Sequence, residues 1–202
     1  MMIVESMFDS PYLFKEMAIL NPSSISKIGK AVEFMRENKI SAVVIGGMAV
    51  SHYVADRALT PDIDFLINDI SHLKEFLTSK GIRYQALASD GAYEGIQIPD
   101  LDADFLDAQA GNVQLNQYVM KTAQTAKISG SQVEIISPSV LCIMKFCIGR
   151  QKDMNDAFKL LKVVDKAQLK ADLMALKKCL TGDITAKEIW NYVQFRDTFT
   201  NV

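Results

Sequence analysis

The longest uninterrupted apolar run of the chain extends only from Ala42 to Val50, and the glycine pair Gly46–Gly47 divides it. A membrane-spanning helix needs about 20 apolar residues in succession, so this run is too short to cross a bilayer. Its first part, up to Ile45, is rich in β-branched residues, which is typical of a buried central strand. The run therefore predicts a strand over 41–45, a glycine turn and a short helix over 48–55, without membrane contact.

The composition limits the class of protein. The 202 residues are 49% hydrophobic and 23% charged, which is too apolar for a disordered chain and sufficient for a core without disulfides. The net charge of −2 excludes a globally basic nucleic-acid coat protein. Cys142, Cys147 and Cys179 include no C-x-x-C pair, which favours a reducing compartment over disulfides or zinc. Because Glu5 and Asp9 lie where a signal peptide would be basic and apolar, we expect a cytoplasmic protein.

The spacing of the other apolar residues predicts an α+β fold. Up to residue 137 we expect helices from Ser23 to Asn38 and over 70–80. The further expected strands cover 62–67, 82–88, 93–98, 101–108, 126–128 and 132–136. After Pro138 we expect helices alone, over 139–148, 153–164, 168–180 and 185–198. This pattern predicts an α+β domain over 1–137, with a mixed sheet flanked by helices, and a helical segment over 138–202 packed on it.

The helical segment is more basic than the rest of the chain. It includes the lysines Lys159, Lys162, Lys166, Lys170, Lys177 and Lys178. Such lysines can bind RNA phosphates, or they can form the solvated face of a helical bundle. Both interpretations stay open at this point.

Two carboxylates in the predicted strand 62–67 indicate a metal site. Asp62 and Asp64 are two residues apart, so their side chains project from the same face of the strand. Adjacent carboxylates repel each other, and a hard divalent cation such as Mg²⁺ or Mn²⁺ would remove that repulsion. The alternative is a solvent-exposed face that carries two ordinary acids.

The glycine pair lies between the predicted buried strand and the short helix. Glycine allows the backbone to approach an anion closely, and the start of a helix offers free N–H donors. Gly46 and Gly47 alone are weak evidence, because glycine pairs also form ordinary turns. A phosphate-binding turn followed by paired strand carboxylates is a rarer combination than either feature.

These motifs, G-G-x-A from Gly46 and R-x-x-T-x-D-x-D from Arg57 to Asp64, resemble the signature of the nucleotidyltransferase superfamily with the DNA polymerase beta fold. The chain is most similar to its minimal bacterial members, including the AbiEii-like proteins. The resemblance continues along the chain from about residue 43 to 160, which is more than half of its length. Asp104 repeats the Asp-Phe-Leu pattern of Asp64, a helix ending near Lys145 follows, and then Arg150 precedes Asp153 and Asp156.

The resemblance implies a nucleotidyltransferase-type fold and a metal-dependent reaction. It implies that Asp62 and Asp64 bind Mg²⁺ or Mn²⁺, and that Asp104 completes the site and can act as the general base. Gly46 and Gly47 would hold a nucleoside triphosphate (NTP). The further nucleotide-binding residues that we predict are Arg57, Thr60 and Lys145. The implied reaction transfers a nucleoside monophosphate (NMP) to an acceptor hydroxyl, carried by RNA, protein or a small molecule, and releases pyrophosphate.

Each supporting residue also has a possible structural role. Lys145 follows an apolar run and can pair with Asp153 instead of a phosphate. Asp102 and Asp107 compete with Asp104 as the third acid. Arg57 can form an ion pair with Asp56 or Glu94, and Thr60 can cap the turn before Pro61.

The whole chain also allows a second function. It would then be an NTP-binding component of a toxin–antitoxin or phage-defence pair, which would bind a cognate partner protein and have little turnover.

Overall fold

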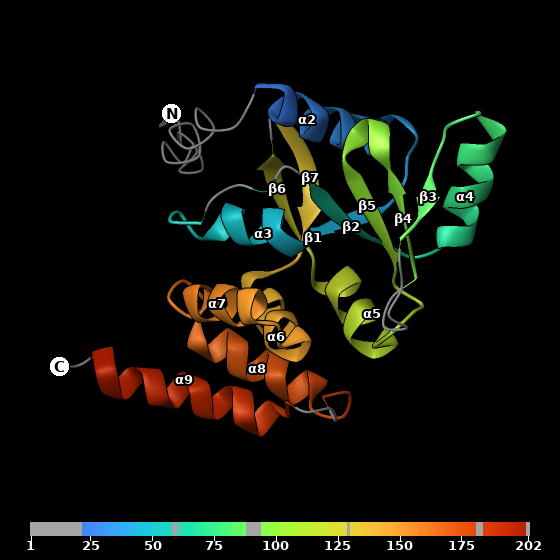
Figure 1. Cartoon of the computed structure of the whole chain (residues 1–202). Coiled ribbons are helices and arrows are strands. Elements are labelled where there is room, and N and C mark those ends of the chain that lie inside the picture. The colour runs from blue at the N-terminus through green and yellow to red at the C-terminus, as the bar shows by residue number, and fades with distance from the viewer. Residues whose placement is uncertain are drawn as a thin grey trace, which may run out of the picture.

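The computed structural model describes residues 22–57, 60, 62–87, 94–128, 130–180 and 184–200. Within these residues the chain forms a seven-stranded mixed sheet in the order β3-β4-β5-β2-β1-β7-β6. Helices lie on both faces of the sheet, and a group of helices follows it (Figure 1). The predicted α+β class, a mixed sheet flanked by helices with a C-terminal helical segment, is confirmed.

The strands are short and the helices have two to four turns. The strands are β1 Ala42–Ile45, β2 Ile63–Ile67, β3 Gln85–Ala86, β4 Gly95–Ile98, β5 Ala103–Asp107, β6 Gln124–Ile128 and β7 Ser131–Ile135. The helices are α2 Pro22–Glu37, α3 Gly46–Tyr53, α4 Ile70–Ser79, α5 Val113–Thr122, α6 Pro138–Ile148, α7 Gln151–Leu160, α8 Lys166–Leu176 and α9 Ala186–Thr200. A single 3₁₀ turn, η1 Pro99–Leu101, precedes β5.

The centre of the sheet is β2, which is antiparallel to β1 and parallel to β5. Because side chains alternate along a strand, residues of β2 and β5 divide between the two faces. Phe65 and Phe105 stack with ring centroids 5.2 Å apart on one face. Asp64 and Asp104 are directly paired across the strands and project from the opposite face. The alternation of side chains that places Phe65 and Phe105 on one face therefore places Asp64 and Asp104 side by side on the other face.

Helices cover both faces of the sheet. On the phenylalanine face, α2 contacts α4 through Phe34 and Phe76, whose ring centroids are 6.2 Å apart. On the acidic face, α3 and α5 pack on β1 and β2, and α6 packs on α3. Helices therefore surround the acidic face of the sheet but leave open space beside its carboxylates.

The helices after residue 137 pack around α6. As its sequence predicted, α6 is buried along most of its length, and α7, α8 and α9 follow it (Figure 1). Asp172 of α8 accepts hydrogen bonds from Ser139 of α6 and from the Tyr118 hydroxyl of α5, the latter at 2.8 Å. This buried carboxylate connects the helical segment to the sheet side of the molecule. The division into domains over 1–137 and 138–202 stays a prediction.

The structure differs from the sequence expectations in a few elements. Helix α3 begins at Gly46, two residues before the expected start, and Gly46 itself has φ +66°. The sequence did not predict α5, whose polar composition conceals its buried residues. The segments that join the expected strands 82–88 and 93–98, and 126–128 and 132–136, lie outside the described residues at 88–93 and at residue 129. Among the helices that the structure describes, none is long and apolar enough to span a bilayer.

Candidate active site

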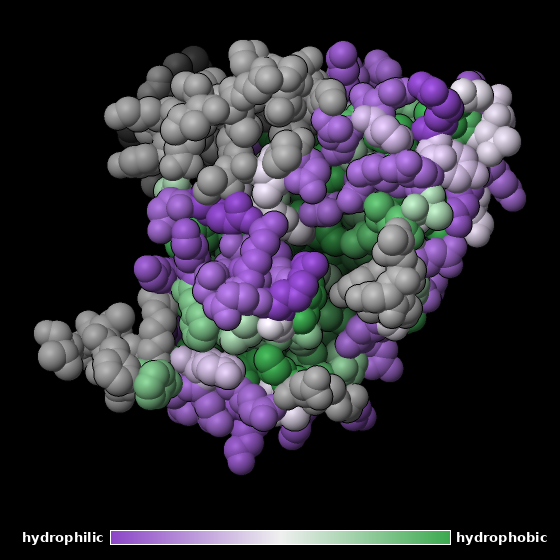
Figure 2. Space-filling view, viewed as in Figure 1, coloured by the Kyte–Doolittle hydropathy of each residue, from purple (hydrophilic) through white to green (hydrophobic). Residues whose placement is uncertain are grey.

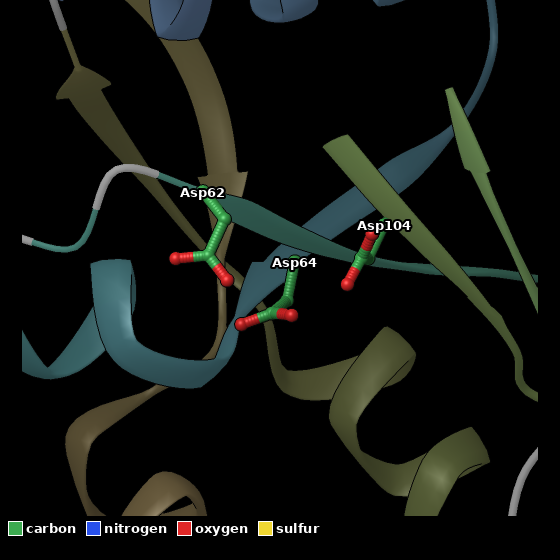
Figure 3. Close-up of side chains that lie close together, drawn as sticks. All are labelled: Asp62, Asp64 and Asp104. Carbon is green, nitrogen blue, oxygen red and sulfur yellow. The ribbon is translucent and has the colours of Figure 1, made fainter. Parts of the chain in front are cut away.

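The three predicted acids, Asp62, Asp64 and Asp104, lie close together on the acidic face of the sheet (Figure 3). Asp64 lies in β2, Asp104 lies opposite it in β5, and Asp62 immediately precedes β2. Each offers one carboxylate oxygen, and these three oxygens lie within 4.8 Å of one another. Oxygens from separate carboxylates at this spacing can bind one divalent cation.

Burial and mutual repulsion make the charged state of this group unfavourable without a cation. Burial, followed by the charges of Asp62 and Asp104, raises the pKa of Asp64 to about 6, against the opposing effects of the Gly47 N–H and Lys145. Burial also raises the pKa of Asp104, and Asp62 adds to this effect.

The site fits a hard divalent cation. The Oδ1 atom of Asp104 is buried and has no hydrogen-bond partner. A buried polar atom without a partner is costly, so it indicates a missing ligand. Carboxylate oxygens are the ligands that Mg²⁺ and Mn²⁺ prefer. The donors present, the unpartnered oxygen and the raised pKa of Asp64 all agree with such an ion.

Neighbouring side chains leave no room for a Cβ atom at Gly46 or Gly47. A Cβ atom on Gly46 would lie 2.6 Å from the Cγ atom of Asp64, and the φ of +66° disfavours other residues there. A Cβ atom on Gly47 would lie 2.6 Å from Cγ2 of Thr60. The start of α3 therefore lies directly against the acidic group, and the Gly47 N–H donates a hydrogen bond to the Asp64 carboxylate.

Thr60 and Asp62 are connected through the backbone. The Thr60 hydroxyl donates a hydrogen bond of 3.0 Å to the carbonyl oxygen of Asp62. Thr60 is buried, so it supports the turn that leads into β2. This contact agrees with the turn-capping role, and a contact of Thr60 with the nucleotide stays a prediction.

The predicted cations Arg57 and Lys145 meet the acids of α7. The Nζ atom of Lys145 lies 2.7 Å from Oδ1 of Asp153 and 3.5 Å from Oδ2 of Asp156. The Nε atom of Arg57 lies 2.9 Å from Oδ1 of Asp156, and Arg150 contacts Asp153 at 2.6 Å. Lys145 is only 4% exposed but still lines the cleft described below. The pair with Asp153 is therefore present, and the phosphate contact of Lys145 stays a prediction.

Asp56 and Glu94, the two acids that the sequence suggested as partners of Arg57, form ion pairs with lysines. Asp56 lies 3.5 Å from Lys159, and Glu94 lies 2.8 Å from Lys74. Asp102 occupies the turn before β5 with φ 48°, whereas Asp104 belongs to the acidic group. Of the three candidates for the third acid, Asp102, Asp104 and Asp107, the structure therefore places Asp104 beside Asp62 and Asp64.

A cleft of about 860 Å³ extends from the acids and the glycine turn between the sheet and helices α5, α6 and α7. Figure 2 shows apolar side chains gathered in the hollow between the sheet and the helices below it. The charged lining residues are Asp62, Asp64, Lys145, Arg150 and Lys152. A volume of this size is in the range of sites for small molecules and cofactors.

Sequence reasoning missed Gln97, which lies beside Asp104. Gln85, Gln97, Asp104 and Asp64 form one cross-strand row through β3, β4, β5 and β2. The Nε2 atom of Gln85 donates to Oε1 of Gln97 at 2.5 Å, which leaves the Gln97 amide nitrogen for Asp104. The hydrogen bond from Gln97 lowers the pKa of Asp104 against the larger effect of burial. Only the strand pairing could have indicated this role.

Comparison with known structures supports the fold. The chain is similar to an antigenic nucleotidyltransferase-like protein from Paracoccidioides brasiliensis, with a TM-score of 0.50, 18% identity, and coverage of 77% of this chain and 87% of that chain. It is also similar to the antibiotic-resistance factor ANT(2'')-Ia, with a TM-score of 0.55, 12% identity, and coverage of 91% and 100%. At such identities the likeness concerns the fold alone. No protein of curated function matches this chain.

A family model described as nucleotidyl transferase of unknown function (DUF2204) matches residues 24–182. The match includes the glycine turn, the three acids, Lys145 and the α7 acids. The resemblance to the nucleotidyltransferase superfamily is thereby confirmed, while the AbiEii-like branch stays a prediction. Because the match covers most of the 202 residues, the chain belongs to this family of nucleotidyl transferases of unknown function.

Proposed function

We propose that this protein transfers an NMP group from an NTP to an acceptor hydroxyl, and that the reaction depends on a divalent cation. The observation that supports this proposal is the position of the acidic group beside the start of α3. Asp62, Asp64 and Asp104 place oxygens within 4.8 Å of one another, and Gly46 contacts Asp64. A cation-binding group next to the start of a helix suits the charge of a triphosphate.

Asp62, Asp64 and Asp104 would hold the cation, Mg²⁺ or Mn²⁺. When bound, such an ion neutralises phosphate charge and favours attack at the α-phosphorus. The N–H groups of Gly46 and Gly47 would bind the phosphates that leave as pyrophosphate. Lys145 would add positive charge at the cleft wall, where Asp153 holds its ammonium group in place.

The reaction forms a bond between the acceptor oxygen and the α-phosphorus, and breaks the bond between that phosphorus and the oxygen bridging to the β-phosphate. The bonding electron pair leaves with pyrophosphate. Asp104 would accept the proton of the acceptor hydroxyl, and Gln97 would orient its carboxylate for this task.

Transfer of a labelled nucleotide tests the proposal. The protein is incubated with each NTP labelled at the α-phosphate, with Mg²⁺ and with a cell extract, and the label is then sought in RNA, protein and small molecules. We expect labelling by the wild-type protein, none by Asp64→Asn, and none with excess chelator. Metal-dependent NTP binding without any transfer would support the second candidate, an NTP-binding member of a toxin–antitoxin or phage-defence pair with a cognate partner.

A further inference from the structure

We infer that the acceptor is an uncharged hydroxyl compound with an apolar body, and this inference rests on the function proposed above. The position of the acceptor follows from the direction of the reaction. The attacking and leaving oxygens lie on opposite sides of the transferred phosphorus. Pyrophosphate would leave toward Gly46, at the end of β1, so the acceptor approaches from the other side of β2.

On that side of β2 lie β5 and β4. Leu106 follows Asp104 by two residues and projects from the same face of β5. Gly95 of β4 is paired with Leu106, and a Cβ atom on it would lie 2.7 Å from Leu87 and 2.9 Å from Leu106. The absence of a side chain on Gly95 lets the two leucines close over the strand. They form a flat apolar floor beside the general base.

The opposite wall of this part of the cleft is formed by α6, which contributes Met144, Cys147 and Ile148, and by α5, which contributes Asn116. Lys145 also belongs to α6, and its ammonium group is paired with Asp153 and Asp156 of α7. The other cations of the lining are Arg150, which immediately precedes α7, and Lys152 of α7, so neither lies on β4, β5 or α5. A polyanionic acceptor would need cations on the β4–β5 side, and a polycationic one would need carboxylates beyond the metal site. The described lining of that side offers neither.

Asn116 supplies a single polar contact to this subsite. Its side chain is 1% exposed and its Nδ2 atom donates to the carbonyl oxygen of Ala110 at 2.8 Å. This bond fixes the orientation of the amide, and the described residues give its Oδ1 atom no donor. Because Asn116 lines the cleft, its Oδ1 atom can accept a hydrogen bond from a ligand there. An acceptor compound with an N–H or O–H group in addition to the hydroxyl that reacts would form this bond.

Binding of neutral probes to the metal-free protein tests the subsite without catalysis. The probes are N-acetyl-tyrosinamide, which is uncharged and aromatic, and methyl glucoside, which is uncharged and polar. Saturation-transfer NMR should detect only the aromatic probe. Leu106→Asn and Leu87→Asn should each weaken its binding roughly tenfold. Leu101→Asn, at a partly buried leucine outside the cleft, should leave binding unchanged.

A transfer assay with the same compounds completes the test. With a labelled NTP and Mg²⁺, N-acetyl-tyrosinamide should accept the label, in preference to glucosamine or a short RNA with a free 3′-hydroxyl. Preferential labelling of the amino sugar or the RNA, or equal binding of both neutral probes, would overturn the inference while the proposed function stands. Absence of metal-dependent NTP binding would instead refute the proposed function, and this result is distinguishable because it does not involve the acceptor.

Discussion

Replacement of Gly46 by alanine tests the contact between the glycine turn and the acidic group. Gly46 and Gly81 have nearly the same φ, +66° and +67°, but a Cβ atom on Gly81 would meet nothing within 4 Å. Gly81→Ala therefore measures backbone strain alone, roughly 1–2 kcal/mol for the left-handed conformation. For a chain of this length that strain lowers the melting temperature by roughly 2–8 °C.

Gly46→Ala adds a collision with Asp64 to the same strain. The Cγ atom of Asp64 would lie 2.6 Å from the new Cβ atom, so it must retreat by at least about 0.8 Å to reach the 3.4 Å at which ordinary contact begins. Metal sites tolerate ligand displacements of only about 0.2 Å. We therefore expect Mn²⁺ affinity to fall roughly 10–100-fold, as when a group that positions a metal ligand is lost.

Calorimetric titration with Mn²⁺, together with thermal unfolding, measures both effects. We expect Gly81→Ala to lose stability and to bind Mn²⁺ like the wild-type protein, and Gly46→Ala to lose both stability and Mn²⁺ affinity. If Gly46→Ala bound Mn²⁺ as tightly as Gly81→Ala, the assignment of Asp64 as a ligand held against the turn would be refuted.

Two further predictions concern charge, and a third concerns the hydrogen bond from Gln97 to Asp104. Burial and neighbouring acids raise the pKa of Asp64 to about 6. Between about pH 4 and 6 the folded protein therefore binds more protons than the unfolded chain, so the free energy of unfolding falls as the pH rises. The charged Asp64 side chain lowers stability at pH 7 and has no such effect below pH 4. Asp64→Asn should therefore raise the free energy of unfolding of the metal-free protein by up to about 3 kcal/mol at pH 7 and by little at pH 4, as measured by urea denaturation; destabilisation at pH 7 would contradict this account. Lys145→Met removes a partner from the buried Asp153 and should cost about 3 kcal/mol, whereas Lys74→Met, which breaks the exposed pair with Glu94, should cost less than about 1 kcal/mol; equal losses in denaturation experiments would argue against a buried network. Gln97→Leu should lower the rate of nucleotide transfer, because Asp104 loses its orienting bond, while the Kd of the NTP changes little; a weakened Kd with an unchanged rate would assign Gln97 to binding instead.

Local pattern predicted the strands and the side on which their acids lie. The two-residue spacing of Asp62 and Asp64 was sufficient to place both on one face. The pairing of Asp64 with Asp104 depends on the parallel contact of β2 with β5, which no local pattern encodes. The sequence indicated that Asp64 and Asp104 meet only through its resemblance to the nucleotidyltransferase superfamily.

Other features depend on contacts between distant segments. The alternation in β4 places Gln97 on the cleft-facing side, but its role depends on pairing with β5. The spacing of residues could not decide whether Lys145 faces a phosphate or an acid, because the answer depends on how α7 packs against α6. Helix α5 was missed because its buried residues, Leu115, Asn116 and Val119, include an asparagine that lines the cleft.

The central claim is that the acidic group binds a cation that an NTP needs. Isothermal titration of an NTP into the wild-type protein, with and without Mg²⁺, measures this directly, and the double variant Asp62→Ala plus Asp64→Ala is the control. The account predicts binding by the wild-type protein only when Mg²⁺ is present and no binding by the double variant. Equal, metal-dependent NTP binding by both proteins would contradict it.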